Sequence, residues 1–531
     1  MVGTAHIDTF VRDRLPPPEL QPEFLFDLPE LQYSDRLNAA VELIDKGDAD
    51  ALALLNDAGS WTYGEMRDLS DRIARLLVEE EALVPGNRVL LRGPNSATMF
   101  AAWLGILKAG GIVVATMPML RPGEIATILE RAQVSHAIVD SRFIGDFRQG
   151  AEQAGTVRSV VKYDGDYGAG ELETRLRAIA PGFTPVATCR DDVALIAFTS
   201  GTTGKPKGCV HYHRDVLASA DSFARHVLKP APSTRWACSA PIAFTFGLGM
   251  LLIFPWRFGG AAVTIEQPGP KPLLEAVAKH GVTNLATAPT AYKAMLPLLP
   301  DHDISTLETC VSAGEHLPAA TWHAWHQATG LRIIDGIGAT EMMHIFISAS
   351  GGDIRPGATG KAVPGYVAAV LDEEGQPIDA GTGRLAVKGP TGCRYFDDER
   401  QAAYVENGWN VTGDTYRADE GGHFWYVARS DDMIISSGYN IAAPVVENAL
   451  YAHPAVQECA VVGAPCEERG QRVKAFVVLA PGYAPDAGIA AELQEHVKAS
   501  IAPYKYPREV EFVEALPKTA TGKLQRFALR G

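Results

Sequence analysis

Cysteine is scarce in this sequence and follows no recognisable pattern. The 531 residues contain seven cysteines, an odd number without a CxxC pair, which argues against both a disulfide framework and a zinc site. No HExxH pair or other tight ligand cluster for a transition metal is present either. We therefore expect free thiols in a reducing, cytoplasmic environment.

Long apolar runs and an excess of positive charge are also absent. The most apolar stretch, MFAAWLGILKAGGIVVATMP, is broken by Lys108, by two glycines and by Pro118, and the opening residues lack a basic region followed by an apolar core. With 48 basic and 63 acidic residues, the formal charge is −15. We therefore expect a soluble protein that binds neither nucleic acid nor membranes and captures anionic ligands locally. The sequence leaves a homodimer open.

The composition is otherwise that of an ordinary globular protein, with 47% hydrophobic and 21% charged residues. A chain of 531 residues exceeds what one core supports, so we expect several packing units. From about Leu69 onward, short apolar strands alternate with helical segments, and this order predicts βαβ units and a mostly parallel sheet. The strands are expected at 87–93, 111–116, 135–140, 193–200, 261–266 and 282–289.

The pattern of expected strands and helices changes at two points along the chain, and these points predict its domain boundaries. After about residue 355, two strands around a Gly-rich turn indicate a β-rich subdomain that extends to about residue 430. The final unit, residues 431–531, alternates helical segments with apolar strands. The predicted fold class is therefore α/β, with a large N-terminal domain at 1–430 and a small α+β C-terminal domain.

The string TSGTTGKPKG combines glycines, hydroxyl side chains and two lysines at the end of an expected strand. Glycine lets backbone N–H groups approach a phosphate, and lysine supplies charge-assisted contacts. The spacing differs from that of a Walker loop, and Pro206 disfavours helical geometry at Lys205. We predict a mobile loop that closes over a triphosphate; the alternative is a solvated turn that joins a strand to a helix. The residues assigned to the phosphates are Thr199, Ser200, Gly201, Thr202, Thr203, Gly204, Lys205 and Lys207.

This string resembles a signature of the acyl-adenylate-forming superfamily, which includes acyl- and aryl-CoA ligases, adenylation domains of peptide synthetases, and luciferases. Four further strings match in the expected order: GIGATE at 336–341, TGD at 412–414, ARSDDMIISSGYNI at 428–441 and PKTATGK at 517–523. At the first of them, Asp335 and Gly336 stand in place of the usual Tyr-Gly opening. The resemblance spans nearly the whole chain and implies that the small C-terminal domain is a mobile lid.

Members of this superfamily join a carboxylate to AMP, which creates a mixed anhydride with a good leaving group. Two anions must be held together for this step, so the site needs a cation between them. By resemblance, Lys523 is the catalytic lysine that contacts both anions, although a lysine in a basic tail is usually solvated. The nearby Lys518 is assigned to structure. The resemblance implies ATP and Mg²⁺ as cofactors and coenzyme A as a co-substrate.

The resemblance also assigns the nucleotide and metal contacts. Thr340 is expected at the α-phosphate, and Glu341 is expected to bind Mg²⁺, which suits a carboxylate plus phosphate oxygens; the alternative for Glu341 is an ordinary acid at a helix start. Asp414 is expected to accept the ribose hydroxyls, with Arg429 as its partner. The other residues assigned to the nucleotide are Gly314, Glu315, Asp335, Gly336 and Ile337.

Asp431 matches the family's hinge residue, two positions after Arg429. Such a hinge lets one small domain serve two half-reactions, because Lys523 must leave the carboxylate before a thiol enters. Gly438, in the string SSGYNI, would line the path of that thiol; the alternative is a glycine turn before a helix.

Two strings predict the pocket for the acid. APIAFTFGLG, at 240–249, falls where the family has an aromatic gate, and GIGATEMMHIFIS resembles the ring pocket of benzoate-type CoA ligases, in which small residues admit a flat ring. A lone histidine such as His344 is otherwise a satisfied core residue. The residues assigned to the pocket are Phe244, Thr245, Phe246, Ala313, Gly338, His344 and Ile345.

The opening residues resemble 2-aminobenzoate-CoA ligases, and the hydroxyl of Thr245 could meet an ortho amino or hydroxyl group. Benzoate, 2-aminobenzoate and salicylate all stay open as substrates. We predict an aryl-CoA ligase that passes the acyl group from the adenylate to coenzyme A. The alternative is an enzyme that loads a carrier protein or stops at the adenylate, but no carrier domain is fused to the chain. Intact Lys523, Glu341 and Asp414 argue against a nucleotide-binding protein without turnover.

Overall fold

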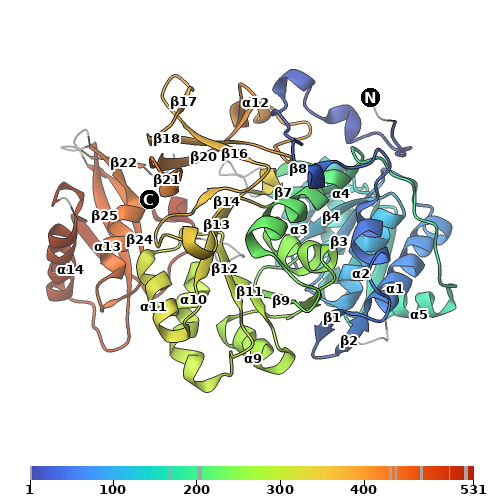
Figure 1. The fold of residues 1–531 in the computed structure, drawn as a ribbon, viewed down its shortest axis with the longest axis horizontal. Helices are drawn as coiled ribbons and strands as arrows, with labels where there is room; N and C mark the ends of the chain where they lie inside the picture. The colour runs from blue at the N-terminus through green and yellow to red at the C-terminus, as the bar shows by residue number, and fades with distance from the viewer. Residues whose placement is uncertain are drawn as a thin grey trace.

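The computed structural model describes the whole chain except residues 1–2, 167–169, 200–205, 430–432, 437–438, 467–469, 502, 519–523 and 531. The described residues form four β-sheets, two of them large and mostly parallel (Figure 1). The other two sheets belong to the β-rich subdomain and to the C-terminal unit. This arrangement agrees with the predicted α/β class.

The first large sheet has six strands in the order β6-β5-β3-β4-β7-β8, and all neighbours are parallel except β7 and β8. Its strands are β3 (Arg88–Arg92), β4 (Ile112–Thr116), β5 (His136–Asp140), β6 (Ser159–Tyr163), β7 (Val193–Thr199) and β8 (Lys207–Tyr212). The accompanying helices are α1 (Tyr63–Arg75), α2 (Ala97–Lys108), α3 (Pro122–Ala132), α4 (Ile144–Ala154), α5 (Glu171–Ala178) and α6 (His213–Ser219). Helices α3 and α4 share one hydrophobic cluster with β3, β4 and β5 and so cover one face of the sheet.

The second large sheet has nine strands in the order β15-β14-β13-β12-β11-β9-β10-β1-β2. They are β1 (Leu52–Asn56), β2 (Gly59–Thr62), β9 (Arg235–Cys238), β10 (Ala261–Val263), β11 (Asn284–Thr287), β12 (Thr309–Ala313), β13 (Ile333–Gly338), β14 (Ile345–Ser348) and β15 (Lys361–Ala362). The neighbouring helices are α7 (Thr245–Leu248), α8 (Phe254–Arg257), α9 (Pro270–His280), α10 (Pro289–Met295) and α11 (Ala319–Thr329). Helices α9, α10 and α11 pack on one face of this sheet.

Helix α2 lies in the core that joins the two large sheets. The Ser96 side chain caps its start by accepting from the backbone N–H of Met99. Every residue of the helix is buried, because the sequence is apolar around the whole circumference. Its buried final residue, Lys108, is compensated by Asp45 at 2.7 Å and Asp71 at 2.6 Å, as a buried charge requires. The same hydrophobic cluster includes residues of β3, β4, β9 and β10.

The β-rich subdomain is an antiparallel sheet ordered β17-β16-β18-β20-β19, with β21 beside β20. Its elements are β16 (Val367–Leu371), β17 (Pro377–Ile378), β18 (Gly381–Lys388), α12 (Gln401–Tyr404), β19 (Val405–Glu406), β20 (Trp409–Ala418) and β21 (Phe424–Arg429). The N-terminal segment runs beside this sheet (Figure 1), and the backbone N–H of Leu25 donates to the carbonyl of Gly389 at 3.0 Å.

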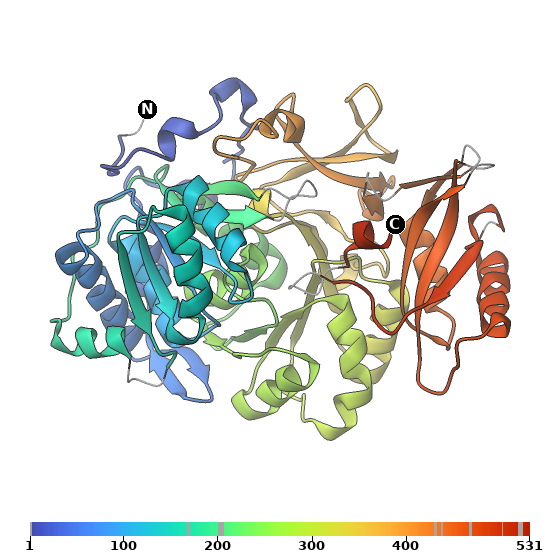
Figure 2. The same ribbon diagram turned by 180° about the vertical axis from the view of Figure 1, so that it is seen from behind.

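The C-terminal unit combines an antiparallel sheet with two helices, and β26 adds to it in parallel. Its elements are β22 (Met433–Ser436), β23 (Tyr439–Ala442), α13 (Ala443–Tyr451), β24 (Val456–Cys466), β25 (Gly470–Leu479), α14 (Ala487–Ser500) and β26 (Glu509–Phe512). It lies at one end of the molecule (Figure 2). Lys293 of α10 reaches it, donating to the carbonyl of Gln457 at 3.1 Å and lying 4.5 Å from the ring centre of Tyr451.

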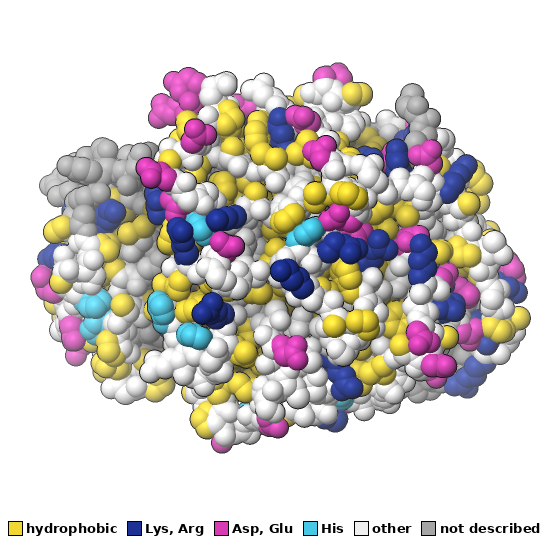
Figure 3. All heavy atoms as spheres, viewed as in Figure 1, with side chains coloured by type: hydrophobic (Ala, Val, Ile, Leu, Met, Phe, Trp, Pro, Cys, Tyr) yellow, Lys and Arg dark blue, Asp and Glu magenta, His cyan; other side chains and the backbone are white. Residues whose placement is uncertain are grey.

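The surface and the cysteines match the expectations from composition. On the face shown in Figure 3, lysine and arginine side chains lie among aspartate and glutamate side chains. All seven cysteines fall within the described ranges and are free thiols. None of the helices that the structure describes is long and apolar enough to cross a membrane.

Candidate active site

The carboxyl ends of β12 and β13 gather most of the residues predicted to bind the nucleotide. Ser312 pairs with Asp335 and Ala313 with Gly336 in parallel register. Gly314 and Glu315, which follow β12, therefore emerge at the same sheet edge as the end of β13. The carboxyl edge of a parallel sheet is where ligands bind in open α/β folds.

A tight turn follows β13 and carries two further predicted residues. Thr340 and Glu341 begin a short 3₁₀-helix that ends at Met342. A Cβ atom at Gly338 would lie 2.8 Å from the carbonyl oxygen of His344, so the close return of the chain requires glycine there. The turn thus presents Thr340 and Glu341 only a few residues from His344.

The predicted phosphate loop closes a β-hairpin. Thr199 at the end of β7 pairs with Lys207 at the start of β8, in antiparallel register. Ser200, Gly201, Thr202, Thr203, Gly204 and Lys205 lie outside the described residues. The alternative of a strand-to-helix turn is therefore wrong, because the chain continues from Pro206 into strand β8 and helix α6 begins only at His213.

Beside this hairpin lies a polar cluster made of Lys207, Tyr395, Glu341, His211 and Thr340. The ammonium group of Lys207 donates to the Tyr395 hydroxyl at 3.4 Å, and this hydroxyl donates to a carboxylate oxygen of Glu341. Nε2 of His211 lies 2.7 Å from the carbonyl oxygen of Thr340, so this nitrogen carries the donated proton. The cluster brings the phosphate hairpin and the turn after β13 together.

The pKa values of Tyr395 and His211 are both shifted by their surroundings in this cluster. Burial and the negative charge of Glu341 raise the pKa of Tyr395, so its hydroxyl remains a donor. Burial alone would lower the pKa of His211, but Cys209 and Asp215 outweigh it, and the pKa is raised. Behind His211, fully buried Asp215 accepts from Nη1 of Arg394 at 2.7 Å.

Sequence reasoning missed Tyr395 and His211. His211 had a local signal, because Lys207, Cys209 and His211 alternate along β8 and so share one face of the strand. Tyr395 had none, since it lies 54 positions from Glu341 and meets it only through the fold.

The predicted ribose contacts lie on neighbouring strands of the β-rich sheet. Asp414 pairs in register with Arg429, and their charged groups are 3.8 Å apart. The ring of His316 stacks on that of Tyr426 with centres 5.4 Å apart, which connects the loop after β12 to β21.

A small cavity lies near these strands, and Leu317, Asp335, Arg355 and Thr359 are among the residues that line it. Burial raises the pKa of Asp335 to about 8, so its carboxyl group is largely protonated at neutral pH.

An aromatic cluster surrounds His344, which follows this turn in the sequence. Its ring lies 5.7 Å from those of Phe223 and Phe246 and 4.6 Å from that of Phe254, measured between centres. Nε2 lies 3.3 Å from the carbonyl oxygen of Phe246. Burial lowers the pKa of His344 to about 3, so the imidazole is neutral. Of the other residues predicted for this pocket, Ala313 and Ile345 are buried.

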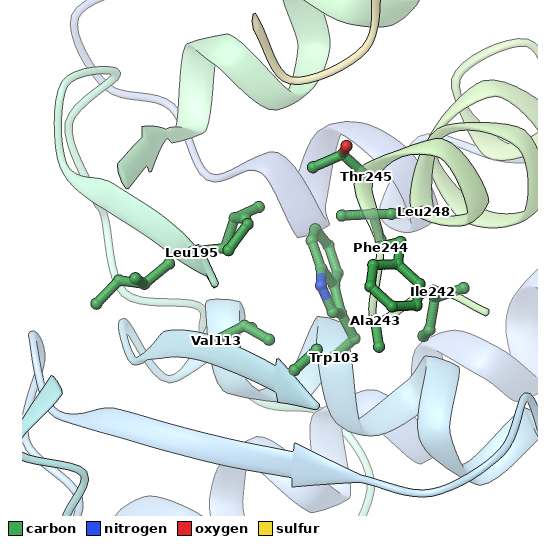
Figure 4. A pocket seen from close by; sticks show the side chains of 11 residues that line it. Trp103, Val113, Leu195, Ile242, Ala243, Phe244, Thr245 and Leu248 are labelled. Carbon is green, nitrogen blue, oxygen red and sulfur yellow. The ribbon is translucent and has the colours of Figure 1, made fainter. Parts of the chain in front are cut away.

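A second, small cavity lies between α2, β4, β7 and the start of α7 (Figure 4). Its walls are apolar apart from Thr245 and include Trp103, Leu195, Phe244 and Leu248. The three residues predicted to form the aromatic gate therefore lie in two places. Phe244 and Thr245 line this cavity, whereas Phe246 packs against His344.

Three other predicted residues, Asp431, Gly438 and Lys523, lie outside the described residues. Within the ranges that the structure describes, no three His, Cys, Asp or Glu side chains are grouped as a metal site. A single carboxylate at Glu341 still suits Mg²⁺, which takes most of its ligands from phosphates and water when it binds with a nucleotide.

Comparison with known proteins shows the family to which the chain belongs. Residues 43–395 match the AMP-binding enzyme family, and residues 445–523 match the AMP-binding enzyme C-terminal domain. The chain belongs to the AMP-binding enzyme family. Within this family it is 36% identical to the benzoate–CoA ligase of Thauera aromatica, over 94% of this chain and 97% of that enzyme.

Two solved structures of family members are similar along almost their whole length. An anthranilate CoA ligase in complex with anthranoyl-AMP has a TM-score of 0.90 at 33% identity and covers 94% of this chain and 98% of its own. A benzoate CoA ligase from Burkholderia xenovorans LB400 has a TM-score of 0.85 at 34% identity, with coverages of 93% and 100%. These matches confirm the resemblance to the aryl-CoA ligase branch and the predicted fold class.

Proposed function

We propose that this protein is an AMP-forming aryl-CoA ligase. In the first step, an oxygen of an aromatic carboxylate attacks the α-phosphorus of ATP, and pyrophosphate leaves. In the second, the thiol of coenzyme A attacks the carbonyl carbon of the aryl-adenylate, and AMP leaves as the thiol proton is released. The observation that carries the proposal is the turn after β13, in which Glu341 contacts Tyr395 beside Lys207 and His344 follows within an aromatic cluster.

The nucleotide would bind along the carboxyl edge of β12 and β13. We assign the α-phosphate to Thr340 and the ribose hydroxyls to Asp414, whose partner Arg429 lies on the neighbouring strand. Glu341 would hold Mg²⁺, which neutralises phosphate charge when it is bound. The further nucleotide contacts are Gly314, Glu315, Asp335, Gly336 and Ile337. Thr199 and Lys207 stand at the base of the phosphate loop.

The C-terminal domain would act as a lid. We propose that Lys523 bridges the carboxylate and the α-phosphate in the first step and leaves for the second by rotation about Asp431. Gly438 would then line the path of the thiol. This assignment divides the chain into residues 1–430 and 431–531, with a β-rich subdomain at about 355–430.

The acid is proposed to be of the benzoate class, with 2-aminobenzoate, benzoate and salicylate as the compounds to compare. The neutral ring of His344 and its aromatic neighbours suit a flat apolar substrate. Thr245 places a hydroxyl at the apolar cavity beside α7, where an ortho amino or hydroxyl group could pair with it.

The test uses the purified protein with Mg²⁺, ATP and a panel of benzoates, and it measures pyrophosphate release and thioester formation with and without coenzyme A. The proposal predicts pyrophosphate and AMP in equal amounts and a thioester that requires coenzyme A. Pyrophosphate release that is independent of coenzyme A, with no thioester, would instead favour an enzyme that stops at the adenylate or loads a carrier protein.

A further inference from the structure

Tyr395 reaches the polar cluster from a different part of the chain than its partners. It lies between β18 and α12, where the backbone runs antiparallel to β8 and Cys209 is directly opposite Tyr395. The backbone N–H of Val210 donates to the carbonyl of Arg394 at 2.9 Å, and that of Phe396 donates to Gly208 at 3.3 Å. These bonds hold the tyrosine, which is 1% exposed, against the strand that begins at Lys207.

The hydroxyl of Tyr395 satisfies two groups that need opposite partners. The Lys207 ammonium has only donors, and the Glu341 carboxylate has only acceptors, whereas a phenol hydroxyl both accepts and donates. Tyr395 accepts from Lys207 and donates to Glu341. The Lys207 ammonium also lies 5.0 Å from the centre of the tyrosine ring. In this row of hydrogen bonds, Lys207 therefore donates to Tyr395 and Tyr395 donates to Glu341.

A neighbouring tyrosine shows that packing alone does not explain this hydroxyl. The ring of Tyr404 meets that of Tyr395 edge to face, with centres 5.8 Å apart. The hydroxyl of Tyr404 is buried and has no hydrogen-bond partner among the described residues. The two tyrosines thus share one packed environment but differ in what their hydroxyl groups contact.

We propose that Tyr395 is a positioning residue of the adenylation site, whose hydroxyl holds the carboxylate of Glu341 and the ammonium of Lys207 in a fixed relation before the metal–nucleotide complex binds. The inference rests on the proposed function, because it takes Glu341 as the metal ligand and Lys207 as a phosphate contact. Tyr395 touches neither the nucleotide nor the acid in this role; it acts through its two partners.

The test compares wild type, Tyr395→Phe and the matched control Tyr404→Phe, each of which removes one buried hydroxyl. The metal probe is Mn²⁺ and the nucleotide is α,β-methylene-ATP. Electron paramagnetic resonance measures the affinity of Mn²⁺ for the protein–nucleotide complex. Calorimetry measures the affinity of the nucleotide in the absence of metal. A hydrogen bond to a charged group corresponds to a loss of roughly tenfold or more. Tyr395→Phe should weaken Mn²⁺ binding by that factor. It should weaken metal-free nucleotide binding by a smaller factor, because only the Lys207 contact is then affected. Tyr404→Phe should change neither.

Unchanged Mn²⁺ affinity in Tyr395→Phe would overturn the inference, as would an equal loss with and without metal, which is the signature of a packing defect. If Tyr395→Phe unfolds at a lower temperature than wild type, two further variants are measured: Lys207→Met alone, and Lys207→Met combined with Tyr395→Phe. The inference then predicts that the two changes together weaken Mn²⁺ binding less than the product of their separate effects, and a simple product would contradict it. Failure of wild type to bind any nucleotide would refute the proposed function itself.

Discussion

Two buried histidines lie close to the turn after β13, and their surroundings differ. His211 lies near Asp215 and Cys209, whose charges outweigh burial and raise its pKa. His344 is packed among Phe223, Phe246 and Phe254, and burial lowers its pKa to about 3. Burial is similar for both side chains, so the neighbouring charges decide the difference. Charged groups therefore surround His211, whereas aromatic rings surround a neutral His344.

The largest effect is expected from Lys523→Ala, which removes the cation proposed to bridge the carboxylate and the α-phosphate. Formation of the aryl-adenylate should fall by at least about a hundredfold, because a preorganised charge at the transition state is lost. Thioester formation from supplied aryl-adenylate and coenzyme A should remain close to wild type. Single-turnover assays of each half-reaction measure both rates, and equal losses in both would contradict the assigned role.

A smaller effect, on metal and nucleotide binding but not on the choice of acid, is expected from Glu341→Gln. Replacing the carboxylate should lower kcat/KM by about ten- to a hundredfold and raise the Mg²⁺ concentration needed for half-maximal rate, since one charged ligand is lost. The loss should be the same for benzoate and 2-aminobenzoate, because the aromatic cluster around His344 is untouched. A loss that depends on the acid would show that Glu341 also affects the choice of acid.

The buried, neutral state of His344 should affect how the free energy of unfolding depends on pH. Burial lowers the pKa of His344 in the folded state to about 3, from an ordinary value of 6.5. Between these two pH values the unfolded chain therefore binds a proton that the folded chain does not. The free energy of unfolding should therefore fall with decreasing pH below 6.5, by up to about 1.4 kcal/mol per pH unit from this site. Urea unfolding at pH 6 and pH 5 should show a shallower fall for His344→Phe. An unchanged slope would mean that His344 is not held neutral.

The smallest effect is expected from Thr245→Val, which removes one hydroxyl from the wall of the cavity beside α7. If an ortho amino group pairs with it, kcat/KM for 2-aminobenzoate should fall by about fivefold, the value of one ordinary hydrogen bond. The value for benzoate should change little. Steady-state kinetics with both acids give the ratio, and an equal change for the two would remove Thr245 from substrate discrimination.

Local sequence patterns predicted the regular elements well. The apolar run at 193–200 became β7 and that at 111–116 became β4, because short apolar runs are local patterns. The alternative of a strand-to-helix turn at the phosphate loop was wrong because β8 pairs with β7, and no local pattern records this pairing.

The contacts within the site were less predictable. Tyr395 and Glu341 meet across 54 positions, and no local pattern records such a contact. The division between Phe244 and Phe246 depends on how the short helix α7 is packed, which the sequence does not show. The assignments of Lys523, Asp431 and Gly438 stay predictions, since these residues lie outside those that the structure describes.

The central claim is that nucleotide and aromatic acid bind at the turn that carries Thr340 and Glu341. The most direct measurement is a crystal structure with 5′-O-[N-(2-aminobenzoyl)sulfamoyl]adenosine, a stable analogue of the aryl-adenylate. The account predicts the sulfamoyl group within hydrogen-bond distance of Thr340, the ribose at Asp414 and the aromatic ring beside His344 and α7. A ring bound away from His344 and α7, or a ribose bound away from Asp414, would contradict it.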